Sequence, residues 1–319
     1  MRALVTGANG FLGSHLCECL LEQGHAVRGL VRATSDLRWL AGRPVELCRG
    51  SLEDGAALAE AVRGMDWVFH AAADLRPRRS EDYFRVNTEG TKLLAGLCAE
   101  HRVGRFVFFS SLAAAGPAVS SDQPLTESGD ARPVSEYGRG KLAAERVLAG
   151  MKERLASVLL RLPAVYGPRD RDGLALFAGI KRGFRLLFGR YVSLIYVKDA
   201  VRAAVLAAER AREPGVVYYL SDGESHEFEE VARLAARLMG RRTVRVRLPG
   251  WVLSAAAGVS EWLSREGSII NRDKARELAQ DCWLCDPGRA RRELGFVPEY
   301  PLERGMVETI RWYEEHEWL

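Results

Sequence analysis

The chain has few of the features that mark secreted or membrane-spanning proteins. Six cysteines in 319 residues are too few for a dense disulfide framework. No uninterrupted apolar run is long enough to cross a membrane, and no basic-then-apolar leader precedes the first predicted strand. The 46 Lys and Arg nearly balance the 42 Asp and Glu, and the basic residues are scattered. We therefore expect a cytoplasmic protein with no stable membrane insertion and no nucleic-acid partner.

The opening of the chain carries a glycine pattern between a strand and a helix. The apolar run 3–5 predicts a strand, and the apolar spacing over 14–23 predicts a helix. Between them, Gly7 permits a tight turn, Gly10 permits a diphosphate to approach the main chain, and Gly13 permits the helix to pack on the strand. Free N–H groups at the start of a helix attract an anion. Because a second predicted strand follows at βαβ spacing, we expect a dinucleotide site.

The end of the second predicted strand decides which dinucleotide is favoured. An acidic side chain there suits the ribose 2′-hydroxyl of NAD, whereas an arginine suits the 2′-phosphate of NADP. This chain has Arg32 at that position, and Ser35 and Arg38 follow closely. The pattern favours NADP(H), while Asp36 keeps NAD(H) open as the alternative.

Candidate catalytic groups come with and after the fifth predicted strand, 105–109. That strand leads into Ser110 and Ser111, at the carboxyl end where doubly wound sheets bind ligands. Farther along, Tyr137 and Lys141 are four residues apart, so they share one face of a predicted helix. Taken alone, the Tyr137 and Lys141 pair also fits the surface of an ordinary amphipathic helix.

Three other features have ordinary explanations that we prefer. Cys282 and Cys285 have the spacing of metal ligands, but no second Cys or His pair accompanies them, so we expect no metal site. The basic segment 181–190 indicates a solvated face, with a phosphate or coenzyme tail as the alternative. The apolar segment 248–263 indicates a packed helix, with a membrane surface or the wall of an apolar pocket as the alternative.

The ordered set of motifs resembles the extended short-chain dehydrogenase/reductase family, also called the epimerase/dehydratase family. The set contains the glycine turn, Ser111 and Tyr137-x-x-x-Lys141, and it continues through Asn87 and the Arg161-Leu-Pro-Ala-Val-Tyr-Gly-Pro168 segment. The resemblance spans nearly the whole chain. It implies an enzyme of the α/β class, with a Rossmann-type doubly wound parallel sheet and a smaller, mainly C-terminal substrate domain.

The resemblance also implies a division of the chain. It assigns 1–168 and 192–221 to the dinucleotide-binding domain, and 169–191 and 222–319 to the substrate-binding domain. It further implies a homodimer formed through the helices that begin near Asp82 and Tyr137.

The family's chemistry gives each candidate residue a role. By resemblance, Tyr137 is the proton shuttle, Ser111 hydrogen-bonds the substrate oxygen, and Lys141 favours the phenolate and holds the nicotinamide ribose. Hydride passes between the carbinol carbon of a small-molecule substrate and the nicotinamide. The cofactor-binding residues that the resemblance implies are Gly7, Asn9, Gly10, Phe11, Leu12, Gly13, Arg32, Ser35, Ser51, Leu52, Ala71, Ala72, Ala73, Asn87, Ser110, Tyr137, Lys141, Pro163 and Val165.

Departures from the family pattern indicate which reaction the chain performs. Sugar-nucleotide dehydratases have an Asp-Glu pair after the serine, and this chain has Leu112 and Ala113. Sugar-nucleotide epimerases commonly have a tyrosine and an asparagine where this chain has Ala115 and Ala164. The chain looks more like the dihydroflavonol reductase-like and 3β-hydroxysteroid dehydrogenase-like branch, which implies a ketone or secondary alcohol on an apolar skeleton. An NDP-sugar epimerase with tightly bound NAD and a dinucleotide-sensing binding protein stay open as alternatives.

Overall fold

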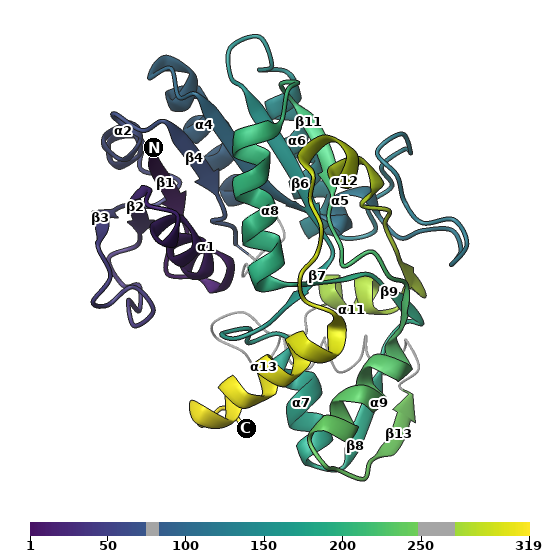
Figure 1. Cartoon of the computed structure of the whole chain (residues 1–319). Helices are drawn as coiled ribbons and strands as arrows, with labels where there is room; N and C mark the ends of the chain where they lie inside the picture. The colour runs from purple at the N-terminus through teal and green to yellow at the C-terminus, as the bar shows by residue number, and fades with distance from the viewer. Residues whose placement is uncertain (75–82, 248–271) are drawn as a thin grey trace.

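The main sheet of the molecule is parallel and has the strand order of a dinucleotide-binding fold (Figure 1). The computed structural model of the chain describes residues 1–74, 83–247 and 272–319. Among them, seven strands lie in the order β3-β2-β1-β4-β5-β6-β11. They are β1 (Arg2–Thr6), β2 (Ala26–Val31), β3 (Val45–Arg49), β4 (Trp67–His70), β5 (Arg105–Ser111), β6 (Ser157–Leu162) and β11 (Val216–Tyr219). The order reverses between β1 and β4, which is where doubly wound sheets bind ligands. The predicted fold is confirmed.

Helices cover both faces of this sheet, so its strands are buried on both sides. One face packs against α1 (Phe11–Glu22), α8 (Val197–Arg210) and α12 (Gly288–Leu294). The other packs against α2 (Gly55–Val62), α4 (Gly90–Glu100) and α6 (Glu136–Ala149). Successive residues of one strand enter opposite cores, as Leu4 and Val5 do in β1. This double burial explains why the central strands β1 and β4 are mainly apolar runs rather than alternating patterns, whereas the edge strand β3 is partly exposed and contains Glu46 and Arg49.

The helix predicted to begin near Asp82 is not α-helical throughout its described residues. It contains a π-helical turn, η1 (Arg85–Glu89), before α4 begins at Gly90. Asn87 and Thr88 are buried in this wider turn, and the Thr88 hydroxyl donates to the Gly140 carbonyl at 3.1 Å. Single π-helical turns are often found at functional sites. Here the turn connects the segment after β4 with the first turns of α6.

Shorter elements lie below the main sheet as drawn in Figure 1. The strands pair as β7 (Ala164–Tyr166) with β10 (Leu194–Tyr196), as β8 (Phe184–Leu187) with β13 (Val244–Arg247), and as β9 (Tyr191–Val192) between β12 (His226–Glu227) and β14 (Cys282–Trp283). The helices are α5 (Leu112–Ala115), α7 (Leu174–Lys181), α9 (Phe228–Leu238), α11 (Arg272–Leu278) and α13 (Leu302–Glu315). A third core, rich in aromatic side chains, joins α7, α9 and α13. The division into two domains at the bounds given above stays a prediction.

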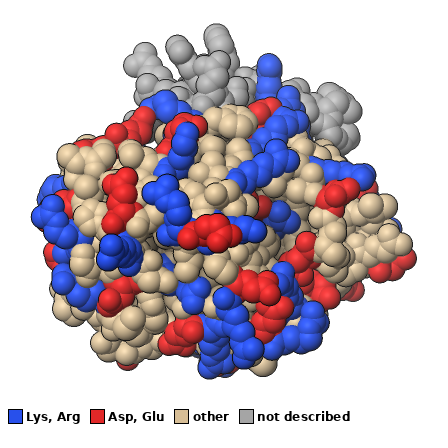
Figure 2. Space-filling view, turned by 90° about the horizontal axis from the view of Figure 1, so that it is seen from above, with Lys and Arg blue, Asp and Glu red and all other residues tan. Residues whose placement is uncertain are grey.

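The outer surface is mixed in charge over the face seen from above, where basic and acidic side chains are interspersed (Figure 2). In the parts of the chain that the structure describes, no helix has both the length and the apolarity needed to cross a membrane. The apolar segment 248–263 lies outside the described residues, and so does Asp82. The cytoplasmic location stays a prediction.

Candidate active site

The three glycines of the turn at the end of β1 have no side chains that cover its main-chain atoms. Gly7 has a φ of +66°, and a Cβ there would lie 2.9 Å from the Cα of Ala72 at the end of β4. A Cβ on Gly13 would lie 2.1 Å from the Gly7 carbonyl oxygen. Gly10 precedes α1, and no side chain among the described residues caps the start of that helix. Because side chains are excluded and N–H groups are left open, this turn fits a dinucleotide diphosphate.

The turn after β2 is exposed and basic. The Ser35 hydroxyl accepts a hydrogen bond from the Arg32 N–H at 3.1 Å, which closes the turn. Asp36 is bonded to Arg38, whose N–H donates to it at 3.0 Å and whose Nε donates at 2.5 Å. The main-chain bond from Arg38, with help from its side chain, holds the pKa of Asp36 below its usual value. The carboxylate that could favour a ribose hydroxyl is therefore paired with Arg38, while the Arg32 side chain is exposed.

A buried, neutral histidine fixes the end of β4 beside the glycine turn. His70 lies between the Thr6 hydroxyl, 2.8 Å from Nδ1, and the Thr91 hydroxyl, 2.9 Å from Nε2. Burial lowers the pKa of His70 to about 3, so its ring is uncharged at neutral pH. The Thr6 hydroxyl also accepts from the Ala72 N–H at 3.1 Å. These bonds hold 71–73, the segment predicted to face the cofactor, against β1.

The remaining predicted cofactor residues surround this edge of the sheet. Asn87 clamps the chain after β4, since its side chain accepts from the Asp74 N–H at 2.8 Å and donates to the Asp74 carbonyl at 3.0 Å. Leu52 is buried against Gly90. Asn9, Phe11 and Leu12 lie in the glycine turn and the first turn of α1, Ser51 lies after β3, and Pro163 and Val165 follow β6.

Ser110 differs from the other candidates because its side chain is held in a buried polar network. Its hydroxyl donates to Glu145 at 2.5 Å. Glu145 also receives two hydrogen bonds from Arg161, at 3.0 and 2.6 Å, and Arg161 donates to the Tyr219 hydroxyl at 2.7 Å. The buried charges are thus paired and hydrogen-bonded, as burial of an ion pair requires. The Ser110 hydroxyl therefore connects β5 to α6.

The structure brings Ser111 and Tyr137 together at the carboxyl edge of the sheet. Ser111 ends β5, and its hydroxyl accepts from the Ala113 N–H at 3.1 Å, which begins α5. The Ser111 side chain lies close enough to Tyr137 to act on the pKa of its phenol. Lys141 lies one turn farther along α6, where its ammonium group donates to the Phe109 carbonyl at 2.7 Å. The three predicted catalytic residues thus come from β5 and α6, the elements that the spacing indicated.

Burial controls the acid–base properties of this group. Burial raises the pKa of Tyr137 above its usual value, the nearby Glu277 carboxylate raises it further, and the Ser111 side chain opposes this shift. Burial lowers the pKa of Lys141 to about 8, against the attraction of Glu145. At neutral pH both the phenol and the ammonium group carry their protons.

Two carboxylates from α11 hold the first turn of α6, and sequence reasoning missed both. Asp273 accepts from the N–H groups of Glu136 and Tyr137, at 2.7 and 3.0 Å. Ser135 caps the same helix by accepting from Gly138 at 3.0 Å, and it donates to Glu277 at 2.7 Å. Negative charge at a helix start is favourable because it opposes the positive end of the helix dipole. Ser135, a typical N-cap residue, was the one local sequence signal for this helix start. The Asp273 carboxylate gave no local signal, because it lies 136 or more residues after the N–H groups that it binds.

Removing the Asp273 carboxylate is expected to displace Tyr137. We expect Asp273→Ala to lower kcat about tenfold, because small misplacements of reacting groups are costly. Cofactor affinity should stay near the wild-type value, and Asp273→Asn should restore most of the rate because one oxygen acceptor remains. Steady-state kinetics and a cofactor titration check this result.

The matched control is Asp286→Ala, which removes a carboxylate that accepts from a main-chain N–H of α12, at 2.8 Å from Gly288. We expect this variant to lose about 0.5–2 kcal/mol of stability, as cap removal does, with kcat unchanged. Equal losses of kcat in both alanine variants would contradict a positioning role for Asp273.

The two cysteines with metal-like spacing lie in different surroundings. Cys282 packs with Ala118 and Leu284, whereas Cys285 packs with Leu112 and Tyr219. The Cys285 thiol is 3.8 Å from the Leu220 carbonyl, and burial holds its pKa above the usual value. Among the residues that the structure describes, no group of three or more His, Cys, Asp or Glu side chains could hold a metal ion.

The doubly wound sheet, its glycine turn and the Ser111–Tyr137–Lys141 group together define a dinucleotide-dependent oxidoreductase. The model of the NAD dependent epimerase/dehydratase family matches residues 3–220. The chain belongs to this family, which confirms the resemblance found in the sequence, and it is an enzyme.

Curated relatives and solved structures match over nearly the whole chain. A ceramide reductase from Caulobacter vibrioides is 32% identical, covering 99% of this chain and 95% of that protein. A 3-beta-hydroxysteroid dehydrogenase from Mycolicibacterium neoaurum is 29% identical, covering 98% and 92%. The UDP-glucose 4-epimerase of Thermus thermophilus, in complex with NAD, is 27% identical and has a TM-score of 0.79, covering 98% and 99%.

Proposed function

We propose that this enzyme is an NADP(H)-preferring reductase that transfers hydride to the carbonyl of an apolar substrate, with Tyr137 as the acid–base group. The observation that carries the proposal is the placement of Ser111 and Tyr137 beside one another at the sheet edge, with the buried Lys141 one helical turn away. A protein that only binds a dinucleotide has no need for this arrangement.

Each residue of the site has a separate role in carbonyl reduction. The open glycine turn binds the diphosphate, and a bound nicotinamide supplies the hydride. Ser111 hydrogen-bonds the carbonyl oxygen of the substrate, and Tyr137 donates its proton to that oxygen as the carbon is reduced. The Lys141 ammonium group stabilises the phenolate that remains. The raised pKa of Tyr137 supports this direction, because it keeps the phenol protonated until the substrate oxygen becomes basic.

The surroundings of Ser111 support an apolar substrate. Leu112 and Ala115 are buried beside the serine, and Ala164 offers no hydrogen-bonding side chain where epimerases have an asparagine. The ceramide reductase and the hydroxysteroid dehydrogenase are named for lipid-like molecules. We infer a ketone attached to a hydrocarbon skeleton.

Arg32 is expected to set the cofactor preference. We expect Arg32→Ala to weaken NADPH binding about tenfold and to leave NADH binding nearly unchanged, because a charge-assisted hydrogen bond is worth roughly 1.5–3 kcal/mol. Fluorescence titrations with both cofactors measure the effect. Arg63→Ala is the control, since Arg63 is also exposed and pairs with Glu60 on α2. Equal weakening of NADPH and NADH binding would contradict a contact between Arg32 and the 2′-phosphate.

Turnover assays separate this function from its alternatives. Purified protein is mixed with NADPH or NADH and tested against long-chain ketones, steroid ketones and sugar nucleotides. The proposal predicts NADPH oxidation driven by an apolar ketone. Retained NAD with an isomerised sugar nucleotide and no net cofactor consumption would favour the epimerase. Cofactor binding without turnover of any substrate would favour the sensing protein.

We also propose that the enzyme is a homodimer formed through α4 and α6. These helices contact one another, and the segment around α4 exposes Phe84 and Leu93. Large exposed apolar side chains favour an interface. Light scattering after size-exclusion chromatography measures the mass, and a monomer would contradict the proposal.

A further inference from the structure

The molecule concentrates its positive charge on one pair of strands. Segments 181–190 and 241–247 contain four Lys or Arg each and no Asp or Glu. These eight charges exceed the whole-chain excess of +4, so the other residues together are net negative at −4. The two segments are distant in sequence, but β8 and β13 pair in parallel and bring them together (Figure 1). We call residues 181–190 and 241–247 the basic strand pair.

Most of these charges are not neutralised by neighbouring carboxylates. Among the described residues, two of the eight form ion pairs, Arg245 with Glu229 at 3.2 Å and Arg190 with Glu227 at 3.8 Å. Lys181, Arg182, Arg241 and Arg242 are exposed and form no ion pair among the described residues. These exposed charges are available to an anionic surface.

Apolar side chains lie in the middle of this charged surface. Phe184 and Val244 are directly opposite one another in the β8–β13 register, and their exposed fractions are 49% and 65%. Neighbouring side chains in a parallel pair lie on one face of the sheet, so these two form a continuous apolar spot. Exposed apolar groups surrounded by cations are typical of proteins that lie on membrane surfaces.

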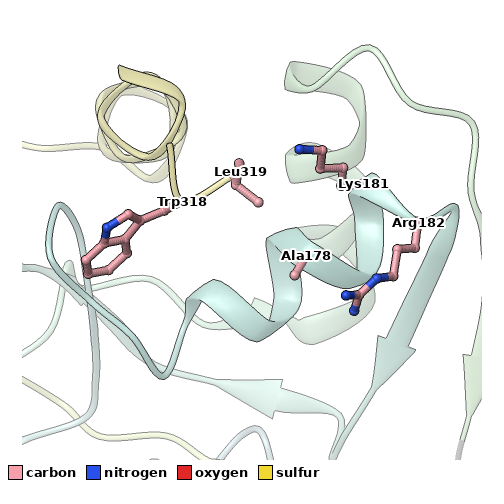
Figure 3. A pocket seen from close by; sticks show the side chains of 5 residues that line it. All are labelled: Ala178, Lys181, Arg182, Trp318 and Leu319. Atoms are coloured by element: carbon pink, nitrogen blue, oxygen red, sulfur yellow. The ribbon is translucent and has the colours of Figure 1, made fainter. Parts of the chain in front are cut away.

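A hollow of about 400 Å³ lies next to this surface. Figure 3 shows Lys181 and Arg182 reaching it from the end of α7, and Trp318 from the segment after α13. Two cations and an indole beside a hollow of this size suit a phosphate-bearing headgroup.

We propose that the basic strand pair docks this enzyme on an anionic phospholipid membrane. Lys181, Arg182, Arg241 and Arg242 meet the headgroups, and Phe184 and Val244 enter the boundary between headgroups and acyl chains. A nucleic acid fits less well, because its phosphates offer no apolar layer for Phe184 and Val244. Given the proposed function, docking also brings the enzyme to the phase in which an apolar ketone is concentrated.

Vesicle flotation of the full chain tests the docking surface. We expect the protein to float with vesicles of phosphatidylcholine containing about 30% phosphatidylglycerol, and to float less at high salt and with phosphatidylcholine alone. Arg241→Glu combined with Arg242→Glu should lower the partition coefficient at least about tenfold. Phe184→Ser should lower it while leaving the net charge unchanged. The matched control, Lys152→Glu combined with Arg154→Glu, makes the same charge change on exposed residues outside the basic strand pair and should float like wild type.

Three results would overturn the proposal. They are equal flotation with neutral and anionic vesicles, equal flotation of both double variants, and binding of duplex DNA in preference to anionic vesicles. Unfolding midpoints and NADPH affinity identify any misfolded variant, and Phe184→Ser then provides an independent test. Turnover of a water-soluble ketone should be unchanged in every variant. An enzyme that floats but reduces no ketone would contradict the proposed function and leave docking supported.

Discussion

Replacing Tyr137 by phenylalanine is expected to lower turnover about a thousandfold, within the range that a positioned acid–base group contributes. The substitution removes the hydroxyl that lies beside Ser111 and keeps the aromatic ring. Cofactor affinity should stay close to the wild-type value, because the diphosphate and ribose contacts are made elsewhere. Stopped-flow measurement of NADPH oxidation gives the rate, and a fluorescence titration gives the affinity.

Tyr218→Phe is the control for this experiment. It also removes a hydroxyl hydrogen bond, the one to Glu293 at 2.7 Å, but it does so on β11, away from the site. We expect this variant to lose stability and retain turnover. If Tyr137→Phe turned over at the wild-type rate, the assignment of the proton donor would be wrong.

Gly13→Ala is expected to abolish dinucleotide binding and to destabilise the fold by roughly 1–3 kcal/mol, as overpacking of a tight interior does. The added Cβ would lie 2.1 Å from the Gly7 carbonyl oxygen, and that neighbour is main chain that cannot turn aside. The turn must open to relieve the contact, which separates α1 from β1. Urea unfolding and cofactor titration measure the two effects.

Gly96→Ala adds the same methyl group as Gly13→Ala but is expected to stabilise the protein. Gly96 lies inside α4, and a Cβ there would meet nothing within 4 Å. We expect this variant to gain up to about 1 kcal/mol, because alanine favours a helix more than glycine does. Similar stabilities for the two variants would contradict the packing assigned to Gly13.

Much of the main sheet could be predicted from the sequence because its signals are local. β2 covers Ala26–Val31 and is mainly apolar, because most of its residues are buried between the two helical layers. Helix starts were less predictable. α1 begins at Phe11, three residues before the predicted start, because Gly10 precedes it without the side-chain cap that marks most helices. The π-helical turn at Arg85–Glu89 has no recognised sequence pattern.

The same distinction applies to the site. The glycine turn and the Tyr137–Lys141 spacing are contained in short segments, so the sequence could identify them. The contact of Asp273 with the Tyr137 N–H joins residues 136 apart, and only the folded chain brings them together. The basic strand pair is a similar case, since the sequence indicated the basic segment 181–190 but not its pairing with β13.

Hydride transfer can be followed directly with NADPH that carries deuterium at both hydrogen positions of C4 of the nicotinamide. The enzyme is given this cofactor and the apolar ketone that it reduces fastest, and the product is examined by mass spectrometry and NMR. The proposed reduction predicts one deuterium on the carbinol carbon of the product. The product should gain this deuterium at the rate at which the cofactor loses it, and this rate should fall in Tyr137→Phe. Substrate conversion with all the deuterium retained in the cofactor, or an unlabelled product, would contradict it.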